Sequence, residues 1–460
     1  MNIILKEVEM PTLSENVVPV DLTKETMDER KDKLLNVMQK RDLDTVIIYA
    51  DREHGSNFEY FTGFIPRFEE ALLVVHKDGR AFLLLGNENT KMVNYSRIKA
   101  ELIHVPFFSL PNQPMENDET LENIFKQADI KEGSQVAVIG WKNFTSTFEE
   151  NKYLYDVPYF IIDTLKKLIK NDQNLVNGCD LLISPKDGIR TINNANEIAH
   201  YEYGETLAGI GVLNTINHIA IGKTELELAN HLLIDGQPNS ITTVCATGDR
   251  FTNATLYPRD KQVKMGDKFS TSVGYKGGLS SRAAYVANNQ EDMPILEKDY
   301  EEVLAKPYYK AIATWLETIK VGLDASEMYD TIETVLPKDV YHWELNPGHF
   351  VADEEWMSSP FYPNSTASVK SGQLFQIDII PKIAGYGGVG CEDGVAIANE
   401  TLREELKKNY PDTWSRISKR QTYIKDVLNI NISEDVLPLN DVVAYYRPYL
   451  LNHSLAFSVE

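Results

Sequence analysis

Apolar and polar positions alternate in short blocks over the first third of the chain. Thr26 and Glu29 have the spacing of a helix capping box, and the apolar positions that follow predict a helix ending near Arg41. Apolar runs predict a second helix and four strands, two of which are joined by a Lys-Asp-Gly turn: the helix at 159–169 and the strands at 45–49, 71–76, 81–85 and 135–140. This mixture of strands and helices indicates an α/β domain.

The remainder of the chain favours longer helices followed by strand-like pieces. Beyond a linker at 185–196, Thr224 and Glu227 form a second capping box. Helices are expected over 196–218, 299–321 and 325–336. We therefore expect a first domain over 1–185 that opens with an extended lead-in at 1–25, a second domain over 190–400, and a C-terminal extension over 401–460 that packs on the second domain.

The composition is that of a globular protein with two cores. A chain of 460 residues exceeds the usual size of one core, and 43% hydrophobic with 25% charged residues is ordinary. The 46 Lys and Arg against 68 Asp and Glu give a net charge of −22, which repels nucleic acid and anionic lipid. We therefore expect neither a nucleic-acid partner nor a membrane partner.

The same composition favours a reducing compartment. No apolar run reaches the ~18 residues of a membrane span. The first nine residues lack the basic and apolar regions of a secretion signal. Cys179, Cys245 and Cys391 are odd in number and widely spaced, which is typical of free thiols. We expect a soluble cytoplasmic protein.

Polar motifs with candidate chemistry gather in the second domain. In chain order they are Gly266-Asp267, Ser280-Ser281-Arg282, Gly348-His349, Phe375-Gln-Ile-Asp378 and Cys391-Glu392-Asp393. Together with Asn57-Phe-Glu-Tyr-Phe-Thr-Gly-Phe64, this layout resembles the pita-bread hydrolases, which include aminopeptidase P, prolidase, methionine aminopeptidase and creatinase. The resemblance implies an α/β N-terminal creatinase-type domain followed by an α+β pita-bread domain. It also implies a homodimer.

The resemblance implies a metal site that is only partly retained. Pita-bread peptidases hold two metal ions with two Asp, one His and two Glu, and the ions activate a bridging water. Three of these positions fall on His349, Asp378 (an Asp in place of Glu) and Glu392. The first Asp position falls on Ser272, and the second falls within 278–284, which contains no acid.

Two His that assist peptide cleavage in the family are also replaced, by Thr255 and Trp356. We therefore predict no tightly bound metal. One divalent ion (Mn, Zn or Co) on His349, Asp378 and Glu392 is the alternative. Creatinase keeps the fold, binds no metal and hydrolyses a C–N bond, but it depends on a His that segment 253–255 lacks. The resemblance to creatinase therefore supports a metal-poor member without fixing the reaction.

The leading functional hypothesis is a metal-independent hydrolase of a C–N bond (amidino, amide or peptide) in a small-molecule or short-peptide substrate. His349 would move the proton, and Asp378 and Glu392 would bind a cationic group. These acids are expected to raise the pKa of His349, and their own pKa values are expected to fall. The alternatives are a non-catalytic binding protein and a mononuclear metallo-aminopeptidase-like hydrolase.

Three other residue types near these motifs have two interpretations each. Arg282 stands where family members carry acids, so it either anchors a substrate carboxylate or pairs with Asp378 or Glu392. Ser280 and Ser281 are more typical of a polar strand end than of a nucleophile, because no base is recognisable beside them. Cys391 is more typical of a buried inert cysteine than of a reactive thiol.

Overall fold

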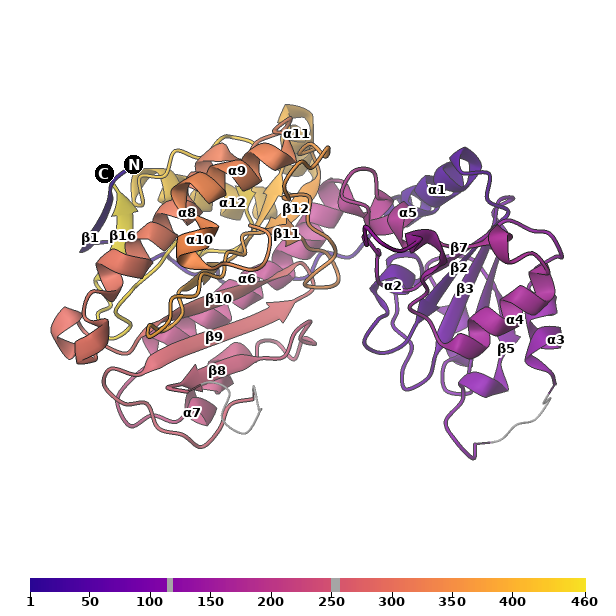
Figure 1. Ribbon diagram of the computed structural model, residues 1–460, viewed down its shortest axis with the longest axis horizontal. Coiled ribbons are helices and arrows are strands. Elements are labelled where there is room, and N and C mark those ends of the chain that lie inside the picture. The colour runs from indigo at the N-terminus through magenta and orange to yellow at the C-terminus, as the bar shows by residue number, and fades with distance from the viewer. Residues whose placement is uncertain (114–118, 250–256) are drawn as a thin grey trace. The chain divides into compact units, whose positions relative to one another are not determined.

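The computed structural model describes residues 1–113, 119–249 and 257–460, and the chain forms two compact units (Figure 1). One unit spans Leu22–Thr191, and the other joins Met1–Asp21 to Ile192–Glu460. The expected first domain therefore loses residues 1–21, because strand β1 (Ile3–Glu7) pairs antiparallel with β16 (Leu455–Val459). The predicted extended lead-in contains one regular element, the strand β1.

The unit Leu22–Thr191 is built on a mixed six-stranded sheet in the order β5-β4-β3-β2-β6-β7. The predicted hairpin is confirmed as the antiparallel pair β3 and β4, and β2 pairs parallel with β6. The strand bounds are β2 Thr45–Ala50, β3 Ala71–His76, β4 Ala81–Leu85, β5 Glu101–His104, β6 Val136–Ile139 and β7 Leu175–Asn177.

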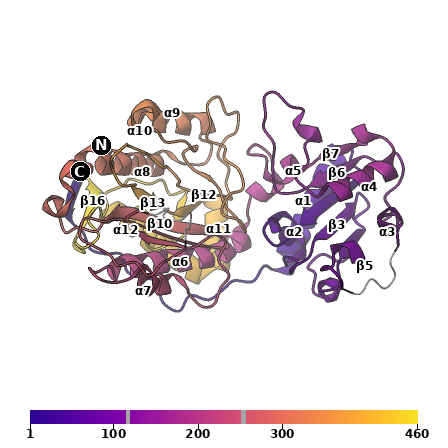
Figure 2. The same ribbon diagram turned by 60° about the horizontal axis from the view of Figure 1, so that its bottom comes forward.

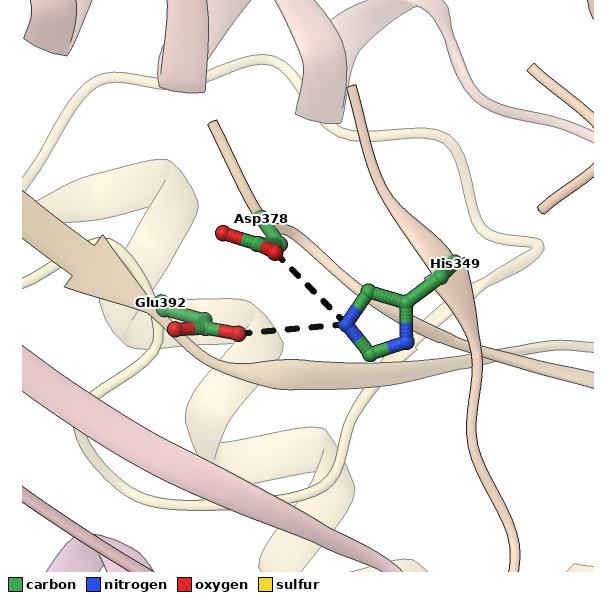
Figure 3. A group of neighbouring side chains, drawn as sticks. All are labelled: His349, Asp378 and Glu392. Carbon is green, nitrogen blue, oxygen red and sulfur yellow. Dashed lines mark ion pairs between the residues drawn. The ribbon is translucent and has the colours of Figure 1, made fainter. Parts of the chain in front are cut away.

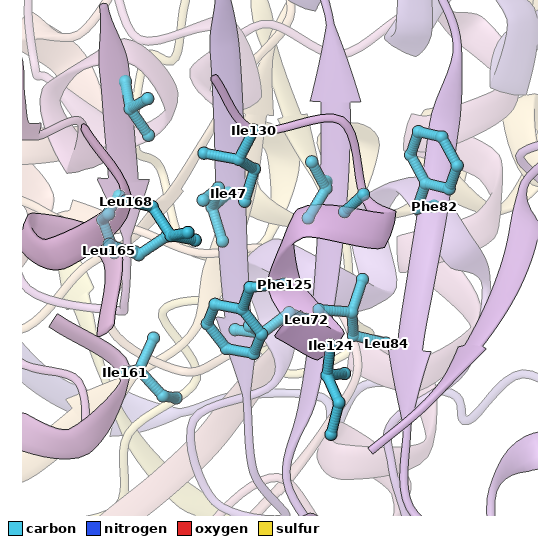
Figure 4. Packing of buried hydrophobic residues seen from close by; sticks show 14 of the residues in the cluster. Ile47, Leu72, Phe82, Leu84, Ile124, Phe125, Ile130, Ile161, Leu165 and Leu168 are labelled. Atoms are coloured by element: carbon cyan, nitrogen blue, oxygen red, sulfur yellow. The ribbon is translucent and has the colours of Figure 1, made fainter. Parts of the chain in front are cut away.

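Helices complete the core of this unit on one face of the sheet. Alternate strand residues such as Ile47 and Leu72 pack against Phe125 and Leu165, which come from α3 and α4 (Figure 4). The helices of this unit as a whole are α1 Lys24–Lys40, α2 Ser56–Thr62, α3 Leu121–Gln127, α4 Tyr159–Ile169 and α5 Cys179–Ile183, of which α3 and α4 contribute to this core. The predicted helix at 159–169 is confirmed as α4.

The first helix begins earlier than its capping pattern predicts. The Thr23 side chain accepts a hydrogen bond from the backbone N–H of Thr26, so Thr23 is the cap and Thr26 is already helical. The predicted capping box at Thr26 and Glu29 is therefore wrong, although the helix itself is confirmed.

The larger unit contains two four-stranded sheets besides the β1–β16 pair. Their orders are β13-β10-β9-β8 and β11-β12-β14-β15. Figure 2 labels β10 and β13 of the first sheet and β12 of the second. The bounds are β8 Val244–Thr247, β9 Lys268–Tyr275, β10 Gly278–Tyr285, β11 His349–Phe350, β12 Gln373–Gln376, β13 Gly390–Glu392, β14 Gly394–Ile397 and β15 Val436–Pro438.

Helix α6 (Ala195–Asn217) packs along the β9–β10 hairpin. Gly204 permits this approach, because a Cβ there would lie 2.0 Å from the Lys276 carbonyl oxygen. The capping box of Thr224 and Glu227 is confirmed. The remaining helices are α7 Glu225–Ala229, α8 Lys306–Thr318, α9 Ala325–Val335, α10 Lys338–Tyr341, α11 Glu400–Asn409 and α12 Pro411–Asp426. Within the described residues, no helix has both the length and the apolar character needed to span a membrane.

Candidate active site

Three side chains converge where the two four-stranded sheets of the larger unit adjoin (Figure 3). His349 opens β11, Asp378 follows the end of β12 by two residues, and Glu392 ends β13. Gly348 allows the chain to reach this position, because it has φ +110° and a Cβ there would lie 2.9 Å from the Gln376 carbonyl oxygen. Segments far apart in sequence thus deliver one imidazole and two carboxyl groups to one point.

The geometry of the cluster is tight without being hydrogen-bonded. His349 Nε2 lies 3.8 Å from Asp378 Oδ2 and 3.9 Å from Glu392 Oε1. One donor atom from each residue lies within 4.8 Å of the others. His349 Nδ1 lies 3.1 Å from the Phe350 carbonyl oxygen, which can only accept, so the proton of the neutral ring belongs on Nδ1. The lone pair of Nε2 then faces the two carboxyl groups.

Strand register places two serines on the same face as Glu392. Ser281 of β10 is the direct partner of Glu392 on one side and of Ser272 of β9 on the other. Directly paired residues project to the same face of a sheet, so both hydroxyl groups face the cluster. All three residues line one pocket of about 820 Å³.

Three further residues, Glu355, Trp356 and Tyr308, line this pocket. The rings of Trp356 and His349 lie 4.2 Å apart between centroids, tilted by 33°. The hydroxyl of Tyr308 accepts a hydrogen bond from the backbone N–H of Cys391. Neither Glu355 nor Tyr308 belongs to a motif identified in the sequence. An acidic run at 353–355 is visible in the sequence, but nothing there indicates which acid faces the site.

The electrostatics of the cluster run opposite to the expectation from sequence. Burial lowers the pKa of His349, and the nearby Asp378 offsets only part of that effect. Burial and the charge of Glu392 raise the pKa of Asp378 well above its usual value, and burial and Glu355 do the same for the pKa of Glu392. The prediction of a charged His349 between ionised acids is therefore wrong, because desolvation outweighs attraction across 3.8–3.9 Å.

Arg282 lies on the opposite face of β10 and is fully engaged. Its guanidinium donates to Asp393 Oδ2 at 2.8 Å. It also donates to the backbone carbonyls of Ser281, Glu392, Val442 and Tyr445. The predicted pairing with Asp378 or Glu392 is wrong, because the partner is Asp393. The substrate-anchor role is also wrong, since no N–H of this buried side chain is left to face a ligand.

The other candidates have structural surroundings. Ser280 is buried and donates to Asp393 Oδ1 at 2.8 Å. Burial raises the pKa of Cys391 to about 12, so its thiol stays protonated at neutral pH. The Thr255 position lies outside the described residues.

Comparison with known proteins places this geometry in a known fold. Residues 30–138 match the creatinase/prolidase N-terminal domain. A prolidase from Pyrococcus horikoshii is 21% identical with a TM-score of 0.59, covering 80% of this chain and 95% of that one. An Xaa-Pro dipeptidase from Bacillus anthracis is 16% identical with a TM-score of 0.60, covering 81% and 96%. No curated protein matches the chain.

This chain has the creatinase/prolidase fold. The fold expectation, an α/β N-terminal creatinase-type domain followed by an α+β pita-bread domain, is thereby confirmed. An X-Pro aminopeptidase from Thermotoga maritima shares the same fold at 16% identity, with a TM-score of 0.60 over 80% of this chain and 95% of that one.

Within the creatinase/prolidase fold, the donor set here suits one divalent ion and not two. His349 Nε2 and one oxygen each from Asp378 and Glu392 could ligate a single ion, and Asp378 Oδ1 is buried without a hydrogen-bond partner among the described residues. The expected position of the first additional ligand holds Ser272, and Ser281, its direct partner on β10, is also neutral. Neutral hydroxyl groups do not bridge two divalent cations as carboxylates do.

Proposed function

We propose that this creatinase/prolidase-fold protein hydrolyses a C–N bond of a small substrate in the pocket that Asp378 and Glu392 line, beside His349. The supporting observation is an imidazole whose pKa is lowered by burial, 3.8–3.9 Å from two carboxyl groups whose pKa values are raised by burial. Groups whose surroundings push their pKa values in opposite directions are suited to act as base and acid in one reaction. The pocket of about 820 Å³ has room for a small molecule or short peptide.

The proton transfers can be assigned to named atoms. Nε2 of His349 accepts a proton from a water whose oxygen attacks the carbon of the C–N bond. The carboxyl group of Asp378 or Glu392 donates its proton to the leaving nitrogen, and the C–N bond breaks. The imidazolium returns its proton to the carboxylate after the product leaves. The hydrogen bond from Nδ1 to the Phe350 carbonyl holds the ring in the tautomer that this step needs.

Turnover of a substrate panel by chelator-treated protein tests the proposal. The panel holds guanidino compounds, N-methyl amino acids and Xaa-Pro dipeptides, the last because similar structures are prolidases and an Xaa-Pro dipeptidase. His349→Gln should lower kcat by at least ~100-fold, since general base catalysis contributes about that much. His218→Gln, at an exposed helix end, is the matched control. Full activity of folded His349→Gln would refute the base assignment.

A single divalent ion on His349, Asp378 and Glu392 is the second candidate. Its support is the unpartnered Asp378 Oδ1 together with the Nε2 lone pair. A bound ion would lower the pKa of a water and polarise the substrate, while the three side chains would hold it in place. Activity that is lost with chelator and returns with Mn²⁺, Zn²⁺ or Co²⁺ would select this candidate. Binding of panel compounds without turnover under either condition would select the non-catalytic alternative.

The homodimer and the cytoplasmic location remain proposals from the family resemblance and the composition. Light scattering on the purified full chain tests the first, and fractionation of the source cells tests the second. A monomer at concentrations where the protein is active would refute the proposed homodimer.

A further inference from the structure

We propose that Glu355 and Trp356 form a recognition wall for an organic cation: a protonated amine that carries an apolar substituent. This inference rests on the proposed function only in using the same pocket. It names the class of substrate that the pocket selects. The inference comes from three observations: how the loop is held, which acids lack donors, and how the indole is exposed.

The loop that carries Glu355 and Trp356 is fixed at its base. Backbone hydrogen bonds join Phe350 N to the Ser358 carbonyl at 2.7 Å and Met357 N to the Phe350 carbonyl at 3.1 Å. A third bond runs from Gly277 N, in the β9–β10 turn, to the Ala352 carbonyl at 2.7 Å. Because Phe350 belongs to the same strand as His349, the loop is positioned directly by the element that positions the imidazole.

The carboxyl groups of the pocket lack hydrogen-bond donors from the protein. Within the described part of the chain, no side-chain hydrogen bond reaches Glu355, Asp378 or Glu392, and Asp378 Oδ1 is buried and unpartnered. Among the described residues that line the pocket, Lys268 is the sole lysine or arginine, and its Nζ is 3.6 Å from Glu297. Buried acids without donors favour a ligand that supplies both N–H groups and positive charge.

The indole of Trp356 adds an apolar surface beside these acids. One face of Trp356 lies against the His349 ring, yet 42% of the residue is exposed. Leu345, Ile379 and Ile380 line the same pocket. An aromatic face attracts a cation, and the apolar lining accommodates a hydrocarbon chain. A metal ion would use the carboxylates and Nε2 but would gain nothing from the indole.

Binding measurements on the full-length, chelator-treated protein test the inference without any need for turnover. The ligands tested are butylamine, methylamine, butyrate and MnCl₂, and calorimetry measures the affinity of each. Butylammonium should bind at least about tenfold more tightly than methylammonium, and butyrate should not bind. Trp356→Leu should remove about tenfold of the butylammonium affinity while leaving Mn²⁺ binding unchanged. Glu355→Gln should weaken both amines by about tenfold, and Glu354→Gln, on the same loop, is the matched control.

Two outcomes would overturn the proposal. One is equal amine affinity in Glu355→Gln, Trp356→Leu and the unaltered protein. The other is tighter binding of butyrate than of butylamine. The amine preference with no turnover of any substrate would instead contradict the proposed hydrolysis and leave this inference standing. Turnover that depends on His349 but ignores the Glu355 and Trp356 variants would do the reverse.

Discussion

Glu392 and Asp393 are neighbours in the sequence and have opposite surroundings. Asp393 is buried and receives hydrogen bonds from Ser280, Arg282 and Asn440. Glu392, on the pocket face, receives none from side chains in the described ranges, and its Oε1 lies 3.9 Å from His349 Nε2. The Asp393 carboxylate therefore has hydrogen-bond donors within the protein. The Glu392 carboxyl group has no side-chain donor among the described residues and is left to interact with a ligand.

The same division follows the strands that flank these residues. On β10, Ser281 faces the pocket while Ser280 and Arg282 face the interior. Ser280 and Arg282 on the interior face donate hydrogen bonds to Asp393, whereas no side chain in the described ranges donates one to Glu392 on the pocket face. A buried acid that is paired with a guanidinium and hydrogen-bonded supports the structure, whereas a buried acid cluster without such partners costs stability and indicates a binding site.

The largest expected effect on stability comes from removing Arg282, the cation that pairs with the buried Asp393. Arg282→Met leaves Asp393 buried without its cation, and such a loss costs about 3–5 kcal/mol of the free energy of unfolding. Urea denaturation, followed by a probe in the larger unit and fitted to the transition of that unit, measures it. His349→Gln, on the pocket face, should change this free energy by less than about 1 kcal/mol. A loss below that level in Arg282→Met would remove the distinction between the two faces.

Rebuilding the acids of the pocket face should create a second ion site. Ser272→Asp with Ser281→Asp adds two carboxylates in direct register with Glu392. Elemental analysis should rise from fewer than one ion per chain toward two. Mn²⁺ at 100 times its dissociation constant should then stabilise the double variant by about 2.7 kcal/mol. Ser272→Asn with Ser281→Asn has the same shape without the charge and is the control.

A smaller effect with a defined pH dependence is expected for Glu392→Gln. In the unaltered protein, folding raises the pKa of Glu392. The contribution of Glu392 to the free energy of unfolding is therefore present below the usual carboxyl pKa of about 4.3 and is lost as the pH rises through the raised pKa. Above that range the Gln variant should be the more stable protein by about 1–3 kcal/mol, and near pH 4.5 the two should converge.

Thermal unfolding from pH 4.5 to 9 measures this difference. The lowered pKa of His349 has the opposite sign: its stability is present above about 6.5 and is lost as the pH falls. Above pH 7 the contribution of His349 no longer changes with pH. A difference in stability between the Gln variant and the unaltered protein in that range therefore reports on the Glu392 carboxyl group. A Gln variant that is less stable at pH 8 would mean that Glu392 is compensated after all.

Local patterns predicted much of the fold because their causes are local. The hairpin of β3 and β4 and the capping box of Thr224 and Glu227 each depend on residues a few positions apart. The convergence of His349, Asp378 and Glu392 was predicted by the family resemblance, since their separations in sequence carry no geometric information. Their catalytic role stays a prediction.

The errors share a physical origin in contacts between distant segments. The partner of Arg282 depends on which face of β10 it occupies, and the direction of the His349 pKa shift depends on burial. The role of Glu355 depends on how the loop after Phe350 is fixed to the β9–β10 turn. None of these quantities can be read from spacing along the chain, because each is set by tertiary packing.

The pairing of β1 with β16 has a consequence for synthesis of the chain. Residues 3–7 leave the ribosome about 450 residues before their partners at 455–459, an interval of roughly 20–90 s at usual rates of translation. The Leu22–Thr191 unit holds its own core and can fold in that time. Strand β1 meanwhile stays unpaired, with free backbone hydrogen-bonding groups and apolar side chains. Chaperones should therefore bind residues 3–7 of nascent chains that are stalled before residue 455.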